Sequence, residues 1–278
     1  MRGKGKAAVR DEEITVVAKF ESELARKRFN DSFAGRNLWP ERGFANMSSD
    51  TVGYPEYIYS VIFKNNWKIF CQHPSVAIVP LVKKFYANFD GGSPNSVYVR
   101  GKRVDISGVP INKVYRLDDV EDKYLEFSKR VCEDQLSEIV KEICVRGTEW
   151  IKSAHGSISL FRCNLKPGPM IWNHFLKSRL MPSIHNHTVN KDRAILLFAV
   201  VVGKKINVGD VISDQIGVCA DRQSGGLRFP SLITSLCLAQ VAGEENPSPV
   251  PEARPSKHSN HIPSGAGSSF LQLEQRIS

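Results

Sequence analysis

Residues 170–237 read MIWNHFLKSRLMPSIHNHTVNKDRAILLFAVVVGKKINVGDVISDQIGVCADRQSGGLRFPSLITSLC, and this stretch decides the fold class. Its apolar residues recur at helical spacing, and proline, glycine and asparagine divide it into segments. It predicts four successive helices. The first runs from Pro167 to Leu180 and the second from Thr188 to Gly203. The third follows an Asn207 cap, and the fourth begins at Pro230. The centre of the second helix is apolar on all sides, so we expect it in the middle of the core.

Further helices are predicted upstream of this stretch. The strongest places Cys132 on its apolar stripe and ends at Gly147, because glycine readily terminates a helix. The predicted segments are residues 13–34, Ile58–Phe70, a helix from a Ser75 cap to Ala87, one or two short helices within 110–127, and the strong helix over 129–146.

One clear β signal interrupts the helical pattern. Residues 96–107, SVYVRGKRVDIS, alternate apolar and polar side chains on both sides of the segment 100–103, which predicts a hairpin. An isolated hairpin is marginal in water, so we expect it to pack on helices. We place Arg100, Lys102 and Arg103 in its turn, where they form the best-shaped local site for a phosphate contact. The simpler interpretation is that these cations keep an exposed turn soluble.

The chain has 278 residues and a formal net charge of +9, which permits a polyanionic partner. The charge is uneven, since residues 118–142 contain nine acidic and four basic residues. Such a mosaic also fits ordinary solvated helix faces. Nucleic acid and self-association remain the two candidate partners. The predicted nucleic-acid-binding residues are Arg26, Lys27, Arg28, Arg100, Lys102 and Arg103.

The ends of the chain differ from its middle in composition. We predict a flexible basic tail over 1–12, a single helical domain over 13–242, and a disordered tail rich in proline and serine over 243–278. The fold class is therefore mainly α, with one small β-hairpin. Six scattered cysteines, no secretory leader and no apolar run of membrane-spanning length favour a protein of the nucleus or cytoplasm that is not secreted.

No catalytic signature stands out. The chain has neither a nucleophile elbow nor a phosphate-binding glycine loop. His185 and His187, with His174 or Cys163, match no zinc spacing. The carboxylates at 105 and 118–122 lack a sheet that would fix them around two metal ions. We expect no catalytic residue, metal site, cofactor, small-molecule substrate or membrane contact.

Dispersed motifs over residues 40–241 resemble the putative plant transposon protein domain family. They include ERGF (41–44), VRGKRVDIS (99–107), KDRAILL (191–197), GKKINVGDVI (203–212) and FPSLITSLC (229–237). The resemblance implies an origin in plant retrotransposons. It carries over no catalytic residue, because the matching positions are mostly apolar helix faces and helix-ending residues.

The leading hypothesis is a retrotransposon-derived, non-enzymatic interaction domain that binds nucleic acid or self-assembles. One alternative is a metal-dependent nucleic-acid strand-transfer enzyme. Another is a protein–protein scaffold whose C-terminal tail recruits a partner. A degenerate genomic remnant is also compatible with the sequence.

Overall fold

The structure, a computed structural model, describes residues 20–44, 54–89, 91, 93, 95–183, 185–222 and 225–241. All of them lie in a unit that ends at Gly243. The two predicted tails, over 1–12 and 243–278, lie outside the described residues.

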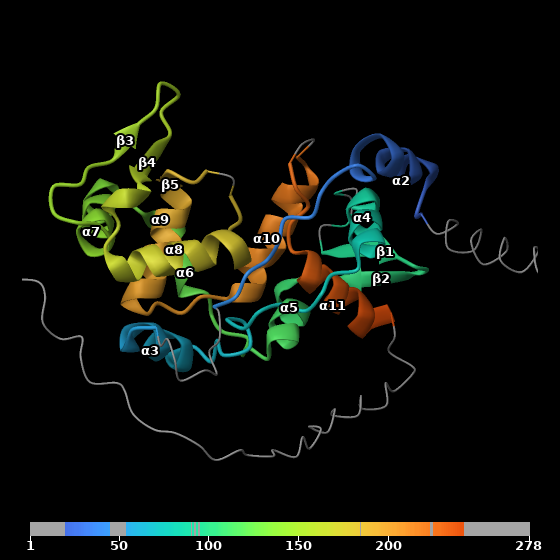
Figure 1. Cartoon of the computed structure of the whole chain (residues 1–278), viewed down its shortest axis with the longest axis horizontal. Coiled ribbons are helices and arrows are strands. Elements are labelled where there is room, and N and C mark those ends of the chain that lie inside the picture. Colours follow the sequence, from blue (N-terminus) through green and yellow to red (C-terminus); the bar gives the residue numbers. More distant parts are fainter. Residues whose placement is uncertain are drawn as a thin grey trace, which may run out of the picture. The chain divides into compact units, whose positions relative to one another are not determined.

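The described part of the chain is mainly α-helical, as predicted (Figure 1). Its helices are α2 (Glu23–Arg28), α3 (Glu56–Lys64), α4 (Val79–Asn88), α5 (Gly108–Tyr115), α6 (Lys123–Arg130), α7 (Glu133–Ile143), α8 (Pro167–Arg179), α9 (Lys191–Val202), α10 (Val208–Ala220) and α11 (Pro230–Val241). A π-helical turn over Phe29–Phe33 continues α2. None of these helices is long and apolar enough to span a membrane.

The four helices predicted over 167–237 are α8 to α11. Residues Arg193–Val200 of α9 are all buried, which confirms the expected central position of this helix. Gly203 ends α9 in the left-handed region at φ 72°, where glycine has no steric penalty. Thr188 was expected to cap α9, but Asn190 does so by accepting a hydrogen bond from the Arg193 N–H.

The predicted hairpin is present as β1 (Ser96–Val99) and β2 (Lys102–Asp105), which pair antiparallel. Its two-residue turn is Arg100-Gly101, and both residues have positive φ, at 50° and 91°. Such a turn matches the natural twist of a hairpin. Lys102 and Arg103 therefore lie in strand β2, which corrects their predicted place in the turn.

A second sheet was not predicted. It consists of β3 (Ile151–Lys152), β4 (Ile158–Phe161) and β5 (Thr188–Asn190), in the order β3-β4-β5 with antiparallel pairing. Strands β3 and β5 span only two and three residues, which is too few to show alternation in the sequence. The segment from 188 also leads straight into α9, so the helical pattern hid the strand.

Several upstream boundaries differ from the prediction, among them the end of α7, which is Ile143 and not Gly147. The helix predicted over Ile58–Phe70 is α3, which already ends at Lys64. Ser75 caps nothing, since α4 begins at Val79 and the Thr234 hydroxyl accepts the preceding Ile78 N–H. Cys132 is not on an apolar stripe but is the exposed N-cap residue of α7.

Helices α5 and α10 approach each other closely. Gly108 and Gly209 face each other there, and a Cβ on Gly209 would lie 2.1 Å from the Gly108 carbonyl oxygen. Asn112 of α5 accepts the Gly209 N–H at 2.8 Å and donates to Asn207 Oδ1 at 2.8 Å. Asn207 in turn caps α10 by accepting the Asp210 N–H, as the sequence predicts.

Candidate functional site

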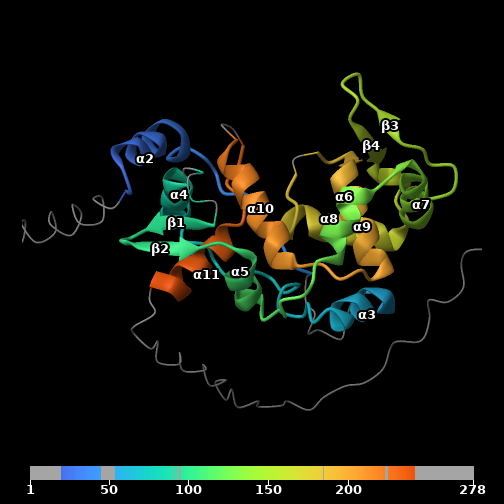
Figure 2. The same ribbon diagram turned by 180° about the vertical axis from the view of Figure 1, so that it is seen from behind.

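The six predicted nucleic-acid-binding cations come from two segments that the fold brings together. Helix α2 packs against α4, and α4 packs against β1. Asn88, the last residue of α4, joins both, since its side chain accepts the Glu21 N–H at 3.2 Å and donates to the Tyr98 carbonyl at 2.7 Å. Figures 1 and 2 show α2, α4 and the hairpin side by side.

Two of the six cations hold this region together. The Arg28 guanidinium donates to the Phe89 carbonyl and lies 5.5 Å from the centre of the Phe33 ring. Arg103 forms an ion pair with Glu21, which links β2 to the segment before α2. The main role of Arg28 and Arg103 is therefore structural.

The other four cations are exposed, and we call Arg26, Lys27, Arg100 and Lys102 the basic surface. Arg26 makes a loose ion pair with Glu23 at 3.7 Å, with both side chains more than half exposed. Burial and the charge of Arg100 lower the pKa of Lys84, so this lysine of α4 lies close to the hairpin turn. Like charges are thus gathered across α2, α4 and the turn.

A second feature is a cavity of about 710 Å³ that lies elsewhere on the fold. Its described lining combines three basic side chains with four aromatic ones. The basic ones are Arg42, His174 and Lys177, and the aromatic ones are Trp39, Phe44, Tyr54 and Phe175.

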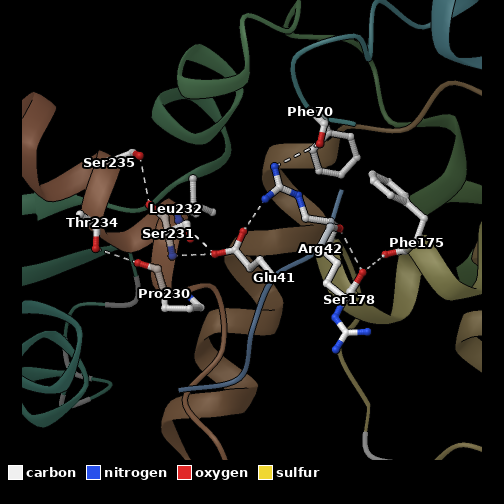
Figure 3. Close-up of polar contacts among 11 residues, drawn as sticks. Glu41, Arg42, Phe70, Phe175, Ser178, Pro230, Ser231, Leu232, Thr234 and Ser235 are labelled. Carbon is white, nitrogen blue, oxygen red and sulfur yellow. Dashed lines mark hydrogen bonds and ion pairs between the residues drawn. The ribbon is translucent and has the colours of Figure 1, made fainter. Parts of the chain in front are cut away.

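The position of Arg42 is set by its neighbours in the chain. Glu41 is buried, and its carboxylate pairs with Arg179 at 2.7 Å and accepts the backbone N–H groups of Ser231 and Leu232 at 2.8 and 3.1 Å (Figure 3). A Cβ on Gly43 would lie 2.2 Å from the Gln72 carbonyl oxygen, so only glycine fits there. Ser178 of α8 also donates to the Arg42 carbonyl at 3.2 Å. The backbone is therefore fixed on both sides of Arg42, while its side chain stays exposed.

The basic side of the cavity is electrostatically uncompensated. Burial and the charges of Arg162, Lys177 and Arg42 lower the pKa of His174, which lies 2.9 Å from an Arg162 nitrogen. Burial and the charges of Arg193 and Arg162 lower the pKa of Lys177. Within the described residues, none of these arginines and lysines forms an ion pair with a carboxylate.

Arg193 extends this positive region behind Lys177. It is 4% exposed, and its Nε has no hydrogen-bond partner. Burial and the charge of Arg228 lower its pKa to about 10. A buried guanidinium without a carboxylate partner is costly, because desolvation is compensated only by pairing.

The described residues contain no arrangement that supports a metal site at His174, His185 and His187. Across the described ranges, no three His, Cys, Asp or Glu side chains are placed to hold a metal ion. His174 is engaged with Arg162, and His185 and His187 are both exposed. Burial and the charges of Asp122, Asp119 and Asp214 raise the pKa of Asp210, so carboxylates do gather at the start of α10. This repulsion alone does not make a metal site.

The cysteines yield a direct test of burial. Cys132 and Cys163 are exposed, whereas Cys71, Cys144, Cys219 and Cys237 are buried. Burial raises the pKa of Cys144 to about 11 and that of Cys237 to about 12, which suppresses the reactive thiolate. We expect Ellman's reagent to titrate two thiols rapidly in the native protein and six after denaturation. Rapid reaction of four or more native thiols, or of any thiol in a Cys132→Ser/Cys163→Ser variant, would contradict this burial.

The cavity was not predicted from the sequence. Its basic residues belong to segments that lie far apart in the chain. The spacing of His174 and Lys177, three residues apart on α8, is the one local signal, since it places both on the same helix face.

Comparison with known proteins identifies a family. The model of the family described as Putative plant retrotransposon-related domain matches residues 63–242. No curated protein and no solved structure matches the chain. The matched range includes the hairpin and α8 to α11, and it begins after α2 and Arg42.

Proposed function

Because this chain belongs to the putative plant retrotransposon-related domain family, we propose that it is a non-enzymatic interaction domain that binds nucleic acid. The basic surface is the single observation that carries the proposal. Its cations reach outward from two neighbouring elements, α2 and the hairpin turn. Arginine and lysine on such a surface contact phosphates without reading the base sequence. We expect the domain to act in the nucleus or cytoplasm.

The division of labour among the six cations supports this proposal. Arg28 joins α2 to the end of α4, and Arg103 joins β2 to the segment before α2, so the exposed cations stand on elements that are tied together. The two-residue turn projects Arg100 beyond the strands. Phosphate binding also relieves the repulsion between Arg100 and Lys84, which gives an anion an electrostatic advantage there.

Fluorescence anisotropy with labelled single- and double-stranded oligonucleotides tests the proposal. The test variant is Arg26→Gln/Lys27→Gln/Arg100→Asn, in which asparagine preserves the positive φ of the turn. We expect it to bind all sequences more weakly by at least about tenfold at low salt. The matched control is Lys129→Gln/Lys141→Gln/Lys152→Gln, which removes the same charge from exposed positions on α6, α7 and β3. Equal losses in the two variants would show only a net-charge effect and would refute the assignment of the surface.

A further inference from the structure

We propose that the cavity binds a nucleoside monophosphate, with its phosphate held by Arg42 and Lys177 and its base stacked on the aromatic wall, which consists of Trp39, Phe44, Tyr54 and Phe175. The cavity shares no residue with the basic surface, so this inference stands or falls independently of the proposed function. A volume of about 710 Å³ lies within the range of roughly 300–1,000 Å³ that is usual for small-molecule sites.

The first argument is the shortage of negative charge at the basic end. Lys177 donates to the Asn186 side-chain oxygen, which leaves its positive charge unneutralised. Among the described residues, Arg42 has no carboxylate partner, and its side chain is exposed beside His174. A phosphate group placed between Arg42 and Lys177 would receive charge-assisted hydrogen bonds from both.

The second, independent argument is the unpartnered guanidinium of Arg193. This side chain is more than nine-tenths buried, and its Nε donates to nothing. Its charge acts on Lys177, which lines the cavity, so Arg193 adds to the positive potential that an anion bound at Lys177 would meet. Asp192 partly offsets this charge, but Arg193 forms no ion pair with a carboxylate among the described residues.

The third argument is the aromatic wall, which selects a nucleotide over a bare anion. Phe44 and Phe175 are buried and stack on each other with ring centres 4.8 Å apart. Tyr54 packs against Phe44 with ring centres 4.8 Å apart, and the half-buried Trp39 lines the same cavity. Trp39 and Tyr54 are thus partly exposed and line the cavity, where a planar base could stack on them.

Isothermal titration calorimetry with AMP, adenosine and inorganic phosphate tests the inference. We expect AMP to bind at least about tenfold more tightly than either fragment, since only AMP engages both ends of the cavity. Arg42→Gln and Lys177→Met should each weaken AMP binding by about tenfold or more. Trp39→Leu should weaken AMP binding by roughly fivefold or more while leaving phosphate binding unchanged. The control Lys152→Met removes an exposed lysine outside the lining and should have no effect.

Several results would overturn the inference. They are the absence of AMP binding, AMP binding no tighter than phosphate, and AMP binding that Arg42→Gln and Lys177→Met leave intact. Retained AMP binding in the basic-surface variant separates the two proposals, because that variant keeps every residue of the cavity.

An NMR titration of His174 tests where the phosphate of the bound nucleotide lies. Burial and the charges of Arg162, Lys177 and Arg42 disfavour the His174 imidazolium, and a bound phosphate would offset the effect of these charges. We therefore expect saturating AMP to raise the pKa of His174, while adenosine does not. An unchanged His174 titration in the AMP complex would exclude the phosphate from this end of the cavity.

Discussion

Replacing Arg179 by methionine is expected to lower the free energy of unfolding by about 3–5 kcal/mol. The ion pair of Arg179 with Glu41 is almost completely buried, with 2% and 1% of the two side chains exposed. Arg179 also donates to the Phe70 carbonyl at 3.1 Å and lies over the rings of Phe70 and Tyr115. Removing it leaves a buried carboxylate with only two backbone donors.

A double-mutant cycle measures this coupling by urea unfolding. Glu41→Gln should also destabilise the protein, because it leaves the Arg179 charge buried without its counter-charge. The double variant Glu41→Gln/Arg179→Met should be more stable than the sum of the single effects predicts, by roughly 0.5–3 kcal/mol. Additive effects would contradict the proposed coupling.

A surface ion pair provides the control for this cycle. Glu23 and Arg26 are 3.7 Å apart with side chains 81% and 58% exposed. Glu23→Gln should therefore change the stability by less than about 1 kcal/mol. A loss of stability comparable to that of Arg179→Met would show that burial does not determine how much these ion pairs contribute to stability.

Replacing Gly209 by alanine should destabilise the protein by about 1–3 kcal/mol, although alanine favours helices. The added methyl group would lie 2.1 Å from the Gly108 carbonyl oxygen and 2.8 Å from Asn112 Oδ1. The first atom belongs to the backbone of α5, and the second belongs to the buried side chain of Asn112. Helices α5 and α10 would have to separate, and Asn112 would lose its hydrogen bond to the Gly209 N–H.

Gly217 is the matched control in the same helix. The nearest atom to a Cβ at this position is Phe89 Cζ, at 4.0 Å. Gly217→Ala should therefore stabilise the protein by up to about 1 kcal/mol, through helix propensity alone. The two substitutions are chemically identical and should shift the thermal midpoint in opposite directions. A shift in the same direction for both would refute the close packing of α5 on α10.

The fold could be predicted where local chemistry determines it. Apolar periodicity located α8 to α11, and Asn207 and Gly203 marked real helix ends. The alternation around Arg100-Gly101 located the hairpin. The strands β3 to β5 could not be predicted, because they are short and their pairing depends on residues distant in the sequence.

The motifs that carry the resemblance to the family are explained by long-range contacts. Glu41 of ERGF binds Arg179 and the start of α11, which contains the motif FPSLITSLC. Gly209 of GKKINVGDVI meets Gly108 and Asn112. A sequence contains these residues but does not state which of them meet, so their roles emerge only in the folded chain.

Prediction of the candidate sites was limited for the same reason. A run of cations marked α2 and the hairpin, but the sequence did not separate Arg28 and Arg103, which bind within the fold, from the exposed cations. The cavity escaped prediction entirely, because Arg42, Lys177 and Arg193 approach one another only through the packing of α8, α9 and the segment at 41–44.

The salt dependence of nucleic-acid binding tests the central claim most directly. The logarithm of the association constant for duplex DNA should fall linearly with the logarithm of the salt concentration. The slope should be shallower by about 2–3 in Arg26→Gln/Lys27→Gln/Arg100→Asn, because three phosphate contacts are lost. Absent binding, or identical slopes for this variant and the wild-type protein, would contradict a nucleic-acid-binding role for the basic surface.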